Sequence, residues 1–271
     1  MCELFAMSSC HPATVTFTLK EFQQHGGEHH HNGDGWGMAF YDGVDARILR
    51  DTTAACESSY FDFIRRHNHP SHCVISHIRQ ATVGGVQLCN TQPFVRELWG
   101  RLNCFAHNGD LEFESALDGP LDFQPIGESD SELSFCKLLT RLRQAAKKQG
   151  GPLTLDQRIH LVREFAAEFS QMGTLNFFYS DGEYLFAHSH KRTQKDGVKR
   201  PPGLFLLQRQ DHHHDHDHQH VHGMHIHTEK IIPEMSLVAS VPLTDEDWQP
   251  MDEGMLAVLR DGTLLGMYPA A

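Results

Sequence analysis

The chain has 271 residues, of which 39% are hydrophobic, so it is long enough to bury a substantial core. Asp and Glu outnumber Lys and Arg by 35 to 23, which gives a formal net charge of −12 and excludes nucleic acid as an expected partner, because such binding needs a basic surface. We find neither an apolar run of the roughly 20 residues that a membrane helix needs nor a secretory signal, so we expect a cytoplasmic protein without a membrane partner.

The seven cysteines are an odd number and include no CxxC pair, which favours reduced thiols over a disulfide framework. We expect most of them to be small buried side chains. Cys2 differs because it follows Met1, which methionine aminopeptidase removes when the next side chain is small. The mature chain would then begin with a thiol nucleophile that carries its own α-amine as base. Taken alone, however, a residue at position 2 is more often a frayed terminus without a function.

Short strands dominate the first third of the predicted secondary structure. A helix is predicted over about residues 18–24, where Gly26 and Gly27 end it, and strands are predicted over 37–41, 73–77 and 101–107.

Two longer helices follow, one from about Ser129 to Leu142 and one from about Asp156 to Met172, both with apolar residues at helical spacing. Asp181-Gly182 and Asp261-Gly262 lie between apolar runs, which predicts two strand hairpins. The order of strands, two adjacent helices and more strands favours an α+β fold with antiparallel sheets.

Three polar stretches lie where a predicted strand ends or a helix begins, so their side chains could converge on a cleft. They are residues 76–85, 105–110 and 127–132. Asn108 and Gly109 offer a carboxamide and a backbone N–H that could stabilise an oxyanion, although Asn-Gly alone is more typical of a tight turn. Arg79, in an otherwise uncharged run, could bind a carboxylate. Asp130 could bind an ammonium group, and its position equally suits a helix cap.

Together these stretches resemble the class-II glutamine amidotransferases, which are N-terminal-nucleophile hydrolases. The resemblance rests on four motifs in order: Met1-Cys2, His77-Ile-Arg-Gln-Ala-Thr82, His107-Asn-Gly109 and Asp130-Ser-Glu132. Further stretches are similar to the compact, stand-alone YafJ-like branch of that family: residues 32–41, 79–86, 90–94, 96–100 and 248–254.

The resemblance implies a four-layer αββα fold, in which two antiparallel sheets lie between helices and Cys2 starts an inner strand. It implies one domain over residues 2–271, with a His-rich surface insertion at about 209–228. It also assigns roles to individual residues. Cys2 is the nucleophile, Asn108 and Gly109 form the oxyanion hole, Arg79 and Asp130 bind the α-carboxylate and α-ammonium of glutamine, and Thr82 supports Arg79. Neither a metal nor another cofactor is implied.

Two departures from the family pattern stand out. Val83 occupies a position where amidotransferases joined to large synthases usually have His, which puts substrate contacts in that loop in question. The amidotransferase-like region also uses nearly the whole chain, so we expect any acceptor or synthase to be a separate protein.

Nine histidines lie between His212 and His227. Alternate imidazoles of an extended segment could bind Zn, Ni or Cu. The more common interpretation of such a composition is a low-complexity surface insertion that binds metal incidentally. We interpret His29, His30 and His31 in the same way, as an exposed loop near the cleft.

Three functions remain open from the sequence. The first is cleavage of the γ-amide of glutamine through a γ-glutamyl thioester. The second is hydrolysis of a γ-glutamyl peptide or thiol metabolite, in which Arg79 and Asp130 would bind the same γ-glutamyl end. The third is a non-catalytic metal-binding module, and the complete set of site residues argues against it.

Overall fold

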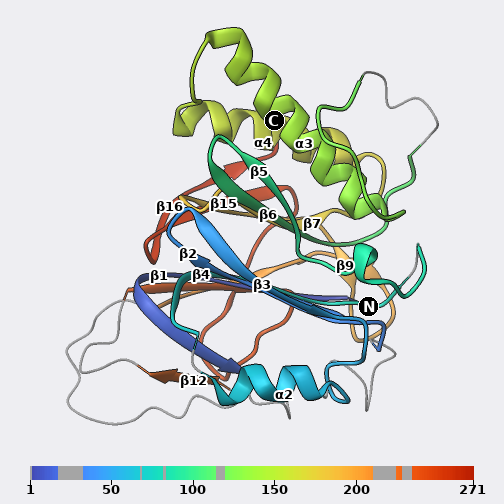
Figure 1. The fold of residues 1–271 in the computed structure, drawn as a ribbon, viewed down its shortest axis with the longest axis vertical. Coiled ribbons are helices and arrows are strands. Elements are labelled where there is room, and N and C mark those ends of the chain that lie inside the picture. Colours follow the sequence, from blue (N-terminus) through green and yellow to red (C-terminus); the bar gives the residue numbers. More distant parts are fainter. Residues whose placement is uncertain are drawn as a thin grey trace.

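The computed structural model describes residues 2–17, 33–67, 69–81, 84–113, 120–209, 224–227 and 234–271. Two antiparallel sheets are stacked face to face between helices (Figure 1). Helices α3 (Asp130–Gln149) and α4 (Leu155–Ser170) cover the outer face of one sheet, and α2 (Ser59–Arg66) covers the outer face of the other. The four-layer αββα fold expected from the sequence is therefore confirmed.

The larger sheet has eight strands in the order β14-β11-β13-β1-β4-β2-β3, and β12 pairs separately with β1. Its central strand β1 pairs on one side with β4 and on the other with β13, where Phe5 lies opposite Ala239. The strands of this sheet are β1 (Glu3–Phe17), β2 (Trp36–Asp42), β3 (Asp45–Asp51), β4 (Ser71–Ile78), β11 (Phe205–Arg209), β12 (Met224–His227), β13 (Met235–Ala239) and β14 (Gln249–Pro250).

The smaller sheet has six strands in the order β16-β15-β8-β7-β6-β5. The chain also forms a separate two-stranded sheet. The six strands are β5 (Phe94–Leu98), β6 (Arg101–Asn108), β7 (Asn176–Ser180), β8 (Leu185–Ser189), β15 (Met255–Arg260) and β16 (Thr263–Pro269). The two-stranded sheet consists of β9 (Arg192–Thr193) and β10 (Lys199–Arg200). The predicted strands at 37–41, 73–77 and 101–107 and both Asp-Gly hairpins are confirmed.

The two long helices begin at side-chain caps that stabilise their first N–H groups. Ser129 Oγ accepts from the backbone N–H of Glu132 at 3.2 Å, and Thr154 forms a reciprocal capping box with Gln157. Gly150 ends α3 in the left-handed conformation, with φ of 79°. The sequence did not predict α2, and the helix predicted over 18–24 lies outside the described residues.

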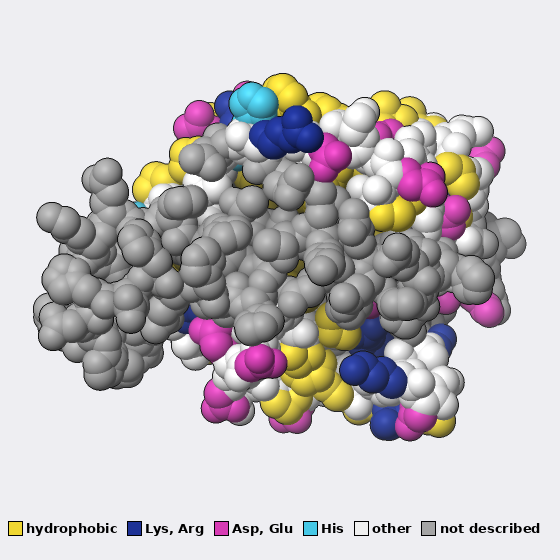
Figure 2. Space-filling view, turned by 90° about the horizontal axis from the view of Figure 1, so that it is seen from below, with side chains coloured by type: hydrophobic (Ala, Val, Ile, Leu, Met, Phe, Trp, Pro, Cys, Tyr) yellow, Lys and Arg dark blue, Asp and Glu magenta, His cyan; other side chains and the backbone are white. Residues whose placement is uncertain are grey.

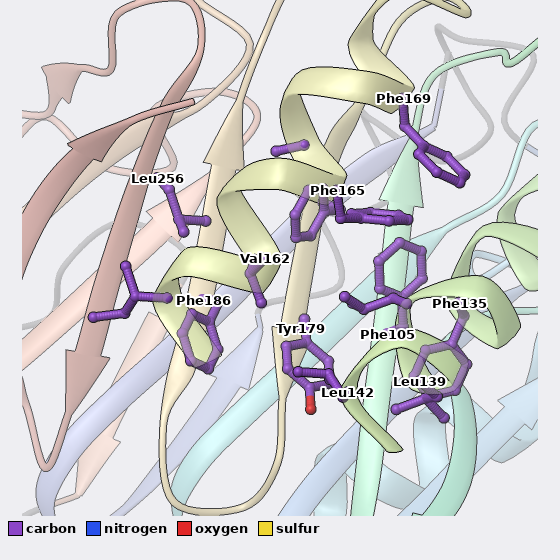
Figure 3. Close-up of a cluster of buried hydrophobic side chains, with 14 of the residues drawn as sticks. Phe105, Phe135, Leu139, Leu142, Val162, Phe165, Phe169, Tyr179, Phe186 and Leu256 are labelled. Carbon is purple, nitrogen blue, oxygen red and sulfur yellow. The ribbon is translucent and has the colours of Figure 1, made fainter. Parts of the chain in front are cut away.

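A core of aromatic and aliphatic side chains fills the space between the smaller sheet and helices α3 and α4 (Figure 3). Phe105 of β6 stacks on Phe135 of α3 with ring centroids 5.4 Å apart, and Phe165 and Phe169 of α4 approach to 4.2 Å. Between the two sheets the buried side chains are smaller, including Ala6, Ala39, Ala106, Ala187 and Ala257. Alanines on both inner faces thus alternate with larger side chains such as Tyr41 and Phe178, while most of the buried aromatic rings belong to the two outer clusters.

All seven cysteines are free thiols, as the sequence predicted. Only Cys104 and Cys136 are buried, and the other five are partly exposed. The expectation that most cysteines are buried is therefore wrong: Cys56 lies in a turn and Cys89 in a short 3₁₀ helix, and Cys10 and Cys73 keep some exposed surface although they lie within β1 and β4.

The described surface seen from the side of α2 carries Lys and Arg side chains interspersed with Asp and Glu (Figure 2). Within the ranges that the structure describes, no helix is both long enough and apolar enough to cross a membrane.

His188 makes the folded state sensitive to acid. Burial among the aromatic rings lowers its pKa from 6.5 to about 4, while Nδ1 donates to the Leu175 carbonyl at 2.9 Å. Because the folded pKa lies below the unfolded value, the stability from neutral His188 is complete above pH 6.5 and falls as the pH drops toward 4. Between pH 7 and pH 5 the loss should be roughly 2 kcal/mol.

We predict that His188→Asn, which keeps a donor near Nδ1 but does not titrate, is less sensitive to acid. Between pH 7 and pH 5 its free energy of unfolding should fall by roughly 2 kcal/mol less than that of the wild type. Urea unfolding at pH 7 and pH 5 measures it. His160→Gln, at an exposed position of α4, is the control and should lose stability like the wild type. An equal loss in His188→Asn and the wild type would contradict the prediction.

Candidate active site

The candidate site lies between the two sheets, where β1 begins and where β4 and β6 end. Leu4, Ala6 and Ile75 are buried in the layer between the sheets. Because side chains alternate along a strand, Cys2 and Arg79 lie on the same face as these residues. Glu3 pairs with Ile78, so Cys2 and Arg79 are the next opposite positions in the ladder.

The backbone N–H and carbonyl of Gln80 flank the Cys2 thiol. The Gln80 N–H donates to Sγ at 3.2 Å, and Sγ lies 3.3 Å from the Gln80 carbonyl oxygen. Burial raises the pKa of the Cys2 thiol to about 11, against the opposing effect of the Gln80 N–H and of the nearby Arg79. The thiol is therefore neutral at pH 7 while Met1 is attached.

Asn108 ends β6 with its side chain directed at the start of the chain. Its Nδ2 donates to the backbone carbonyl of Cys2 at 2.6 Å, and the side chain is buried. A carboxamide NH₂ has two hydrogens, so this contact fixes the group and leaves a second donor. The structure thus places the predicted oxyanion residue against the predicted nucleophile, 106 positions away in the sequence.

Gly109 is held against a neighbouring backbone where no side chain fits. A Cβ at this position would lie 1.8 Å from the Thr174 carbonyl oxygen and 2.8 Å from His107 Nε2. Asn108 and Gly109 do not form a hairpin turn, because Asn108 still pairs with Asn176 of β7 and the chain then continues to a bridge between Leu111 and Gly173.

Arg79 is buried, with 4% of its surface exposed, which confirms that it is not an ordinary solvated charge. Its Nη1 donates to the Gly85 carbonyl at 3.2 Å and its Nη2 to the Gly84 carbonyl at 3.3 Å. These carbonyl oxygens orient the guanidinium, and as neutral acceptors they do not themselves cancel its charge.

Asp130 is the first residue of α3, and the helix cap is Ser129, so the interpretation of Asp130 as the cap is wrong. One carboxylate oxygen accepts from the Leu111 N–H at 2.9 Å, and the other accepts from the Ser131 N–H at 2.8 Å. The first contact ties Asp130 to the loop that follows Gly109. Thr82, Val83 and the loop of His29, His30 and His31 lie outside the described residues.

His107 and His77 are buried beside these residues, although sequence reasoning assigned them no role. His107 Nδ1 lies 2.9 Å from Ser131 Oγ, and Nε2 lies 3.0 Å from the Thr174 carbonyl, so Nε2 carries the proton and Nδ1 accepts from the hydroxyl. Burial, with His107 and Arg79 nearby, lowers the pKa of His77 to about 3.

Three other buried amides that sequence reasoning missed hold the site together. Asn176 Nδ2 donates to the carbonyl of Asn108 at 3.1 Å, while Asn90 and Gln92 reach the loops around Arg79 and Asp130. Residues 90–94 were noted for their family resemblance, but no pattern in the sequence indicated their contacts.

Among the described residues, no group of three or more His, Cys, Asp or Glu side chains is arranged to hold a metal ion. The His-rich tract lies outside the described residues, apart from the backbone of Met224–His227, which forms β12 and pairs with β1.

Comparison with known proteins places the chain in a family. The family model for class-II glutamine amidotransferases matches residues 1–270. The chain is 34% identical to the Escherichia coli protein named "Putative glutamine amidotransferase YafJ" over 257 residues, which cover 94% of this chain and 95% of the relative.

A crystal structure described as that of a predicted glutamine amidotransferase from Pseudomonas aeruginosa superimposes with a TM-score of 0.68. It has 29% identity, with 98% of this chain and 100% of that chain covered. A shorter match of 90 residues, 32% identical, joins 33% of this chain to 36% of a γ-glutamyl-hercynylcysteine sulfoxide hydrolase from Mycobacterium tuberculosis.

We predict that Gly109→Ala destabilises the fold at the site, because the new Cβ would meet the Thr174 carbonyl at 1.8 Å. The free energy of unfolding in urea should fall by at least about 2 kcal/mol. Gly151→Ala is the matched control, since no atom lies within 4 Å of the Cβ built there, and its effect should stay within about 0.5 kcal/mol. Equal effects of the two substitutions would show that the close approach at Gly109 is not a constraint.

Proposed function

Because the chain belongs to the class-II glutamine amidotransferases, we propose that it cleaves the γ-amide of glutamine through a γ-glutamyl thioester on Cys2. The observation that carries this proposal is the contact of Asn108 Nδ2 with the Cys2 carbonyl at 2.6 Å. It brings a carboxamide donor to the one cysteine that can become the N-terminal residue.

Removal of Met1 would activate the nucleophile. The new α-amine lies on the same residue as the thiol and has an unperturbed pKa of about 8, so it can accept the thiol proton near neutral pH. The resulting ammonium group stabilises the thiolate and opposes the burial that raises the pKa of the Cys2 thiol to about 11 in the unprocessed chain.

The reaction then proceeds by acyl transfer. The thiolate attacks the γ-carbonyl carbon, and the second Nδ2 hydrogen of Asn108 and the N–H of Gly109 bind the oxyanion. The α-ammonium of Cys2 protonates the amide nitrogen as the C–N bond breaks, and ammonia leaves. Water, deprotonated by the same amine, attacks the thioester, releases glutamate and returns the thiol.

Arg79 and Asp130 would recognise the amino-acid end of glutamine. A guanidinium oriented by the Gly84 and Gly85 carbonyls can form a bidentate pair with the α-carboxylate. The Asp130 carboxylate, fixed by two backbone N–H groups, would accept from the α-ammonium. Thr82 remains a proposed supporting residue beside Arg79.

A γ-glutamyl peptide or thiol metabolite is the second candidate substrate. The partial match to a γ-glutamyl-hercynylcysteine sulfoxide hydrolase favours it, and Arg79 and Asp130 would bind the same γ-glutamyl end in both cases. If the ammonia has a synthetic use, we propose that a separate acceptor protein receives it. Release of ammonia and of glutamate from a panel of γ-glutamyl compounds distinguishes these cases.

We predict that the mature protein begins at Cys2 and that activity depends on this residue. Intact-mass measurement should show loss of Met1, and Cys2→Ala should abolish glutamate release because no other group supplies the nucleophile. Cys10→Ala is the control, since Cys10 is a free thiol farther along the same strand, and it should retain activity. Glutamate release by Cys2→Ala at the wild-type rate would refute the mechanism.

Arg79→Lys and Asn108→Ala should impair different kinetic constants. Lysine cannot form the bidentate contact, so Arg79→Lys should mainly raise KM for glutamine. Asn108→Ala removes a donor that acts in the transition state, so kcat should fall by roughly 10² to 10³. Steady-state assays of both variants measure the two effects, and an exchange of the two phenotypes would contradict the assigned roles.

A further inference from the structure

We propose that Asn90 is a positioning residue that sets the separation of the two groups that recognise substrate, and that Gln92 extends the same brace to the oxyanion residue. This inference rests on the proposed function, because it concerns how Arg79 and Asp130 bind one amino acid together. Neither Asn90 nor Gln92 would contact the substrate or the reacting atoms.

The carboxamide of Asn90 connects two loops that are far apart in the sequence. Its Nδ2 donates to the Gly85 carbonyl at 3.1 Å, and its Oδ1 accepts from the Glu128 N–H at 2.9 Å. Asn90 is 1% exposed, although its partners Gly85 and Glu128 reach the surface, so loss of either bond would leave a buried polar atom of Asn90 without that partner. One rigid, planar group thus spans the space between the two loops.

On the first side, Asn90 shares a carbonyl with Arg79. The oxygen of Gly85 accepts from Asn90 Nδ2 and from Arg79 Nη1 at 3.2 Å. Gly84 holds the other end of the guanidinium, and a Cβ on Gly84 would lie 2.8 Å from Asn90 Nδ2. The position of the Arg79 guanidinium therefore depends on a loop that packs directly against Asn90.

On the second side, Asn90 holds the segment that leads into Asp130. A Cβ on Gly127 would lie 2.2 Å from Asn90 Oδ1, so the backbone there approaches as closely as a glycine allows. Glu128 donates its N–H to the same oxygen, Ser129 caps the helix, and Asp130 follows as its first residue. The start of α3 is thereby fixed relative to the loop of Arg79.

Gln92 makes the third connection. Its Oε1 accepts from the His107 N–H at 2.5 Å, and its Nε2 donates to the His107 carbonyl at 3.1 Å and to Ser131 Oγ at 3.3 Å. His107 precedes Asn108, and Ser131 follows Asp130. The segment itself is anchored by Arg50 of β3, whose Nη1 donates to the Thr91 carbonyl at 2.8 Å.

The chemistry of the amide gives a selective test. In Asn90→Asp the new side chain has the same shape as that of Asn90 and keeps an acceptor for the Glu128 N–H. A carboxylate, however, cannot donate to the Gly85 carbonyl, and its negative oxygen repels the carbonyl oxygen. Asn90→Asp should therefore release the loop of Arg79 while keeping the segment of Asp130 in place.

Asn103→Asp is the matched control. Asn103 is also fully buried, its Nδ2 donates to the Leu98 and Arg101 carbonyls, and its Oδ1 accepts from Tyr179, but it lies at the far end of β6. Thermal unfolding should show that both variants are folded and comparably destabilised, so that a difference in kinetics is not a difference in stability.

The experiment compares three amides: glutamine, 4-aminobutanamide, which lacks the α-carboxylate, and glutaramic acid, which lacks the α-ammonium. For Asn90→Asp we expect KM for glutamine to rise about tenfold or more while kcat changes less than about threefold. The preference for glutamine over 4-aminobutanamide should fall by the same factor, and the preference over glutaramic acid should remain. Asn103→Asp should keep the wild-type values.

Gln92→Glu is the contrasting variant. It loses the donors to His107 and Ser131, so it should lower kcat more than it raises KM. An Asn90→Asp variant with wild-type KM and wild-type selectivity would overturn the inference while leaving the proposed function intact. An equal loss of the preference for glutamine over 4-aminobutanamide and over glutaramic acid would also overturn the inference, because such a loss would show general damage to the site. A wild-type protein that cleaves none of the three amides would refute the proposed glutamine activity and with it this inference.

Discussion

The register between β1 and β4 is the constraint on which the site depends. Glu3 pairs with Ile78 and Leu4 with His77, so Cys2 and Arg79 share the face that looks into the space between the sheets. A shift of β1 by one residue against β4 would turn Cys2 to the outer face, where α2 and its aromatic contacts lie, while Arg79 kept its direction. The ten or so residues that follow Cys2 therefore determine the direction of its thiol, the proposed nucleophile.

The layer between the sheets explains how side chains from opposite sheets can meet. Alanines lie on both inner faces of the sheets, and most of the large rings lie in the outer clusters against α3, α4 and α2, with Tyr41 and Phe178 as exceptions between the sheets. At the open end of this layer a side chain as short as that of Asn108 reaches the backbone of Cys2 from the other sheet. The aromatic cores thus provide stability, while the thin layer provides the geometry of the site.

Local features of the fold were predictable from the sequence, and contacts between distant segments were not. Ser129 and the Asp-Gly hairpins act within a few residues, so their patterns indicated the helix start and the turns. Cys2, Arg79, Asn108 and Asp130 were recognised only because their motifs occur together in a known order. Asn90 escaped because its partners lie 5 and 38 residues away, and α2 escaped because its 8 residues are too few to show a helical period clearly.

The pairing of β1 with β13 has a consequence for the order of events during synthesis. The first strand needs partners from residues 71–78 and from residues 235–239, so the sheet around Cys2 cannot close until most of the chain has left the ribosome. At about 5–20 residues per second, the interval between the emergence of the N-terminus and that of β13 is of the order of ten seconds or more. A processing enzyme would meet Met1 on an open strand during that interval. The proposed nucleophile would thus lose Met1 first, and the sheet around Cys2 would form afterwards.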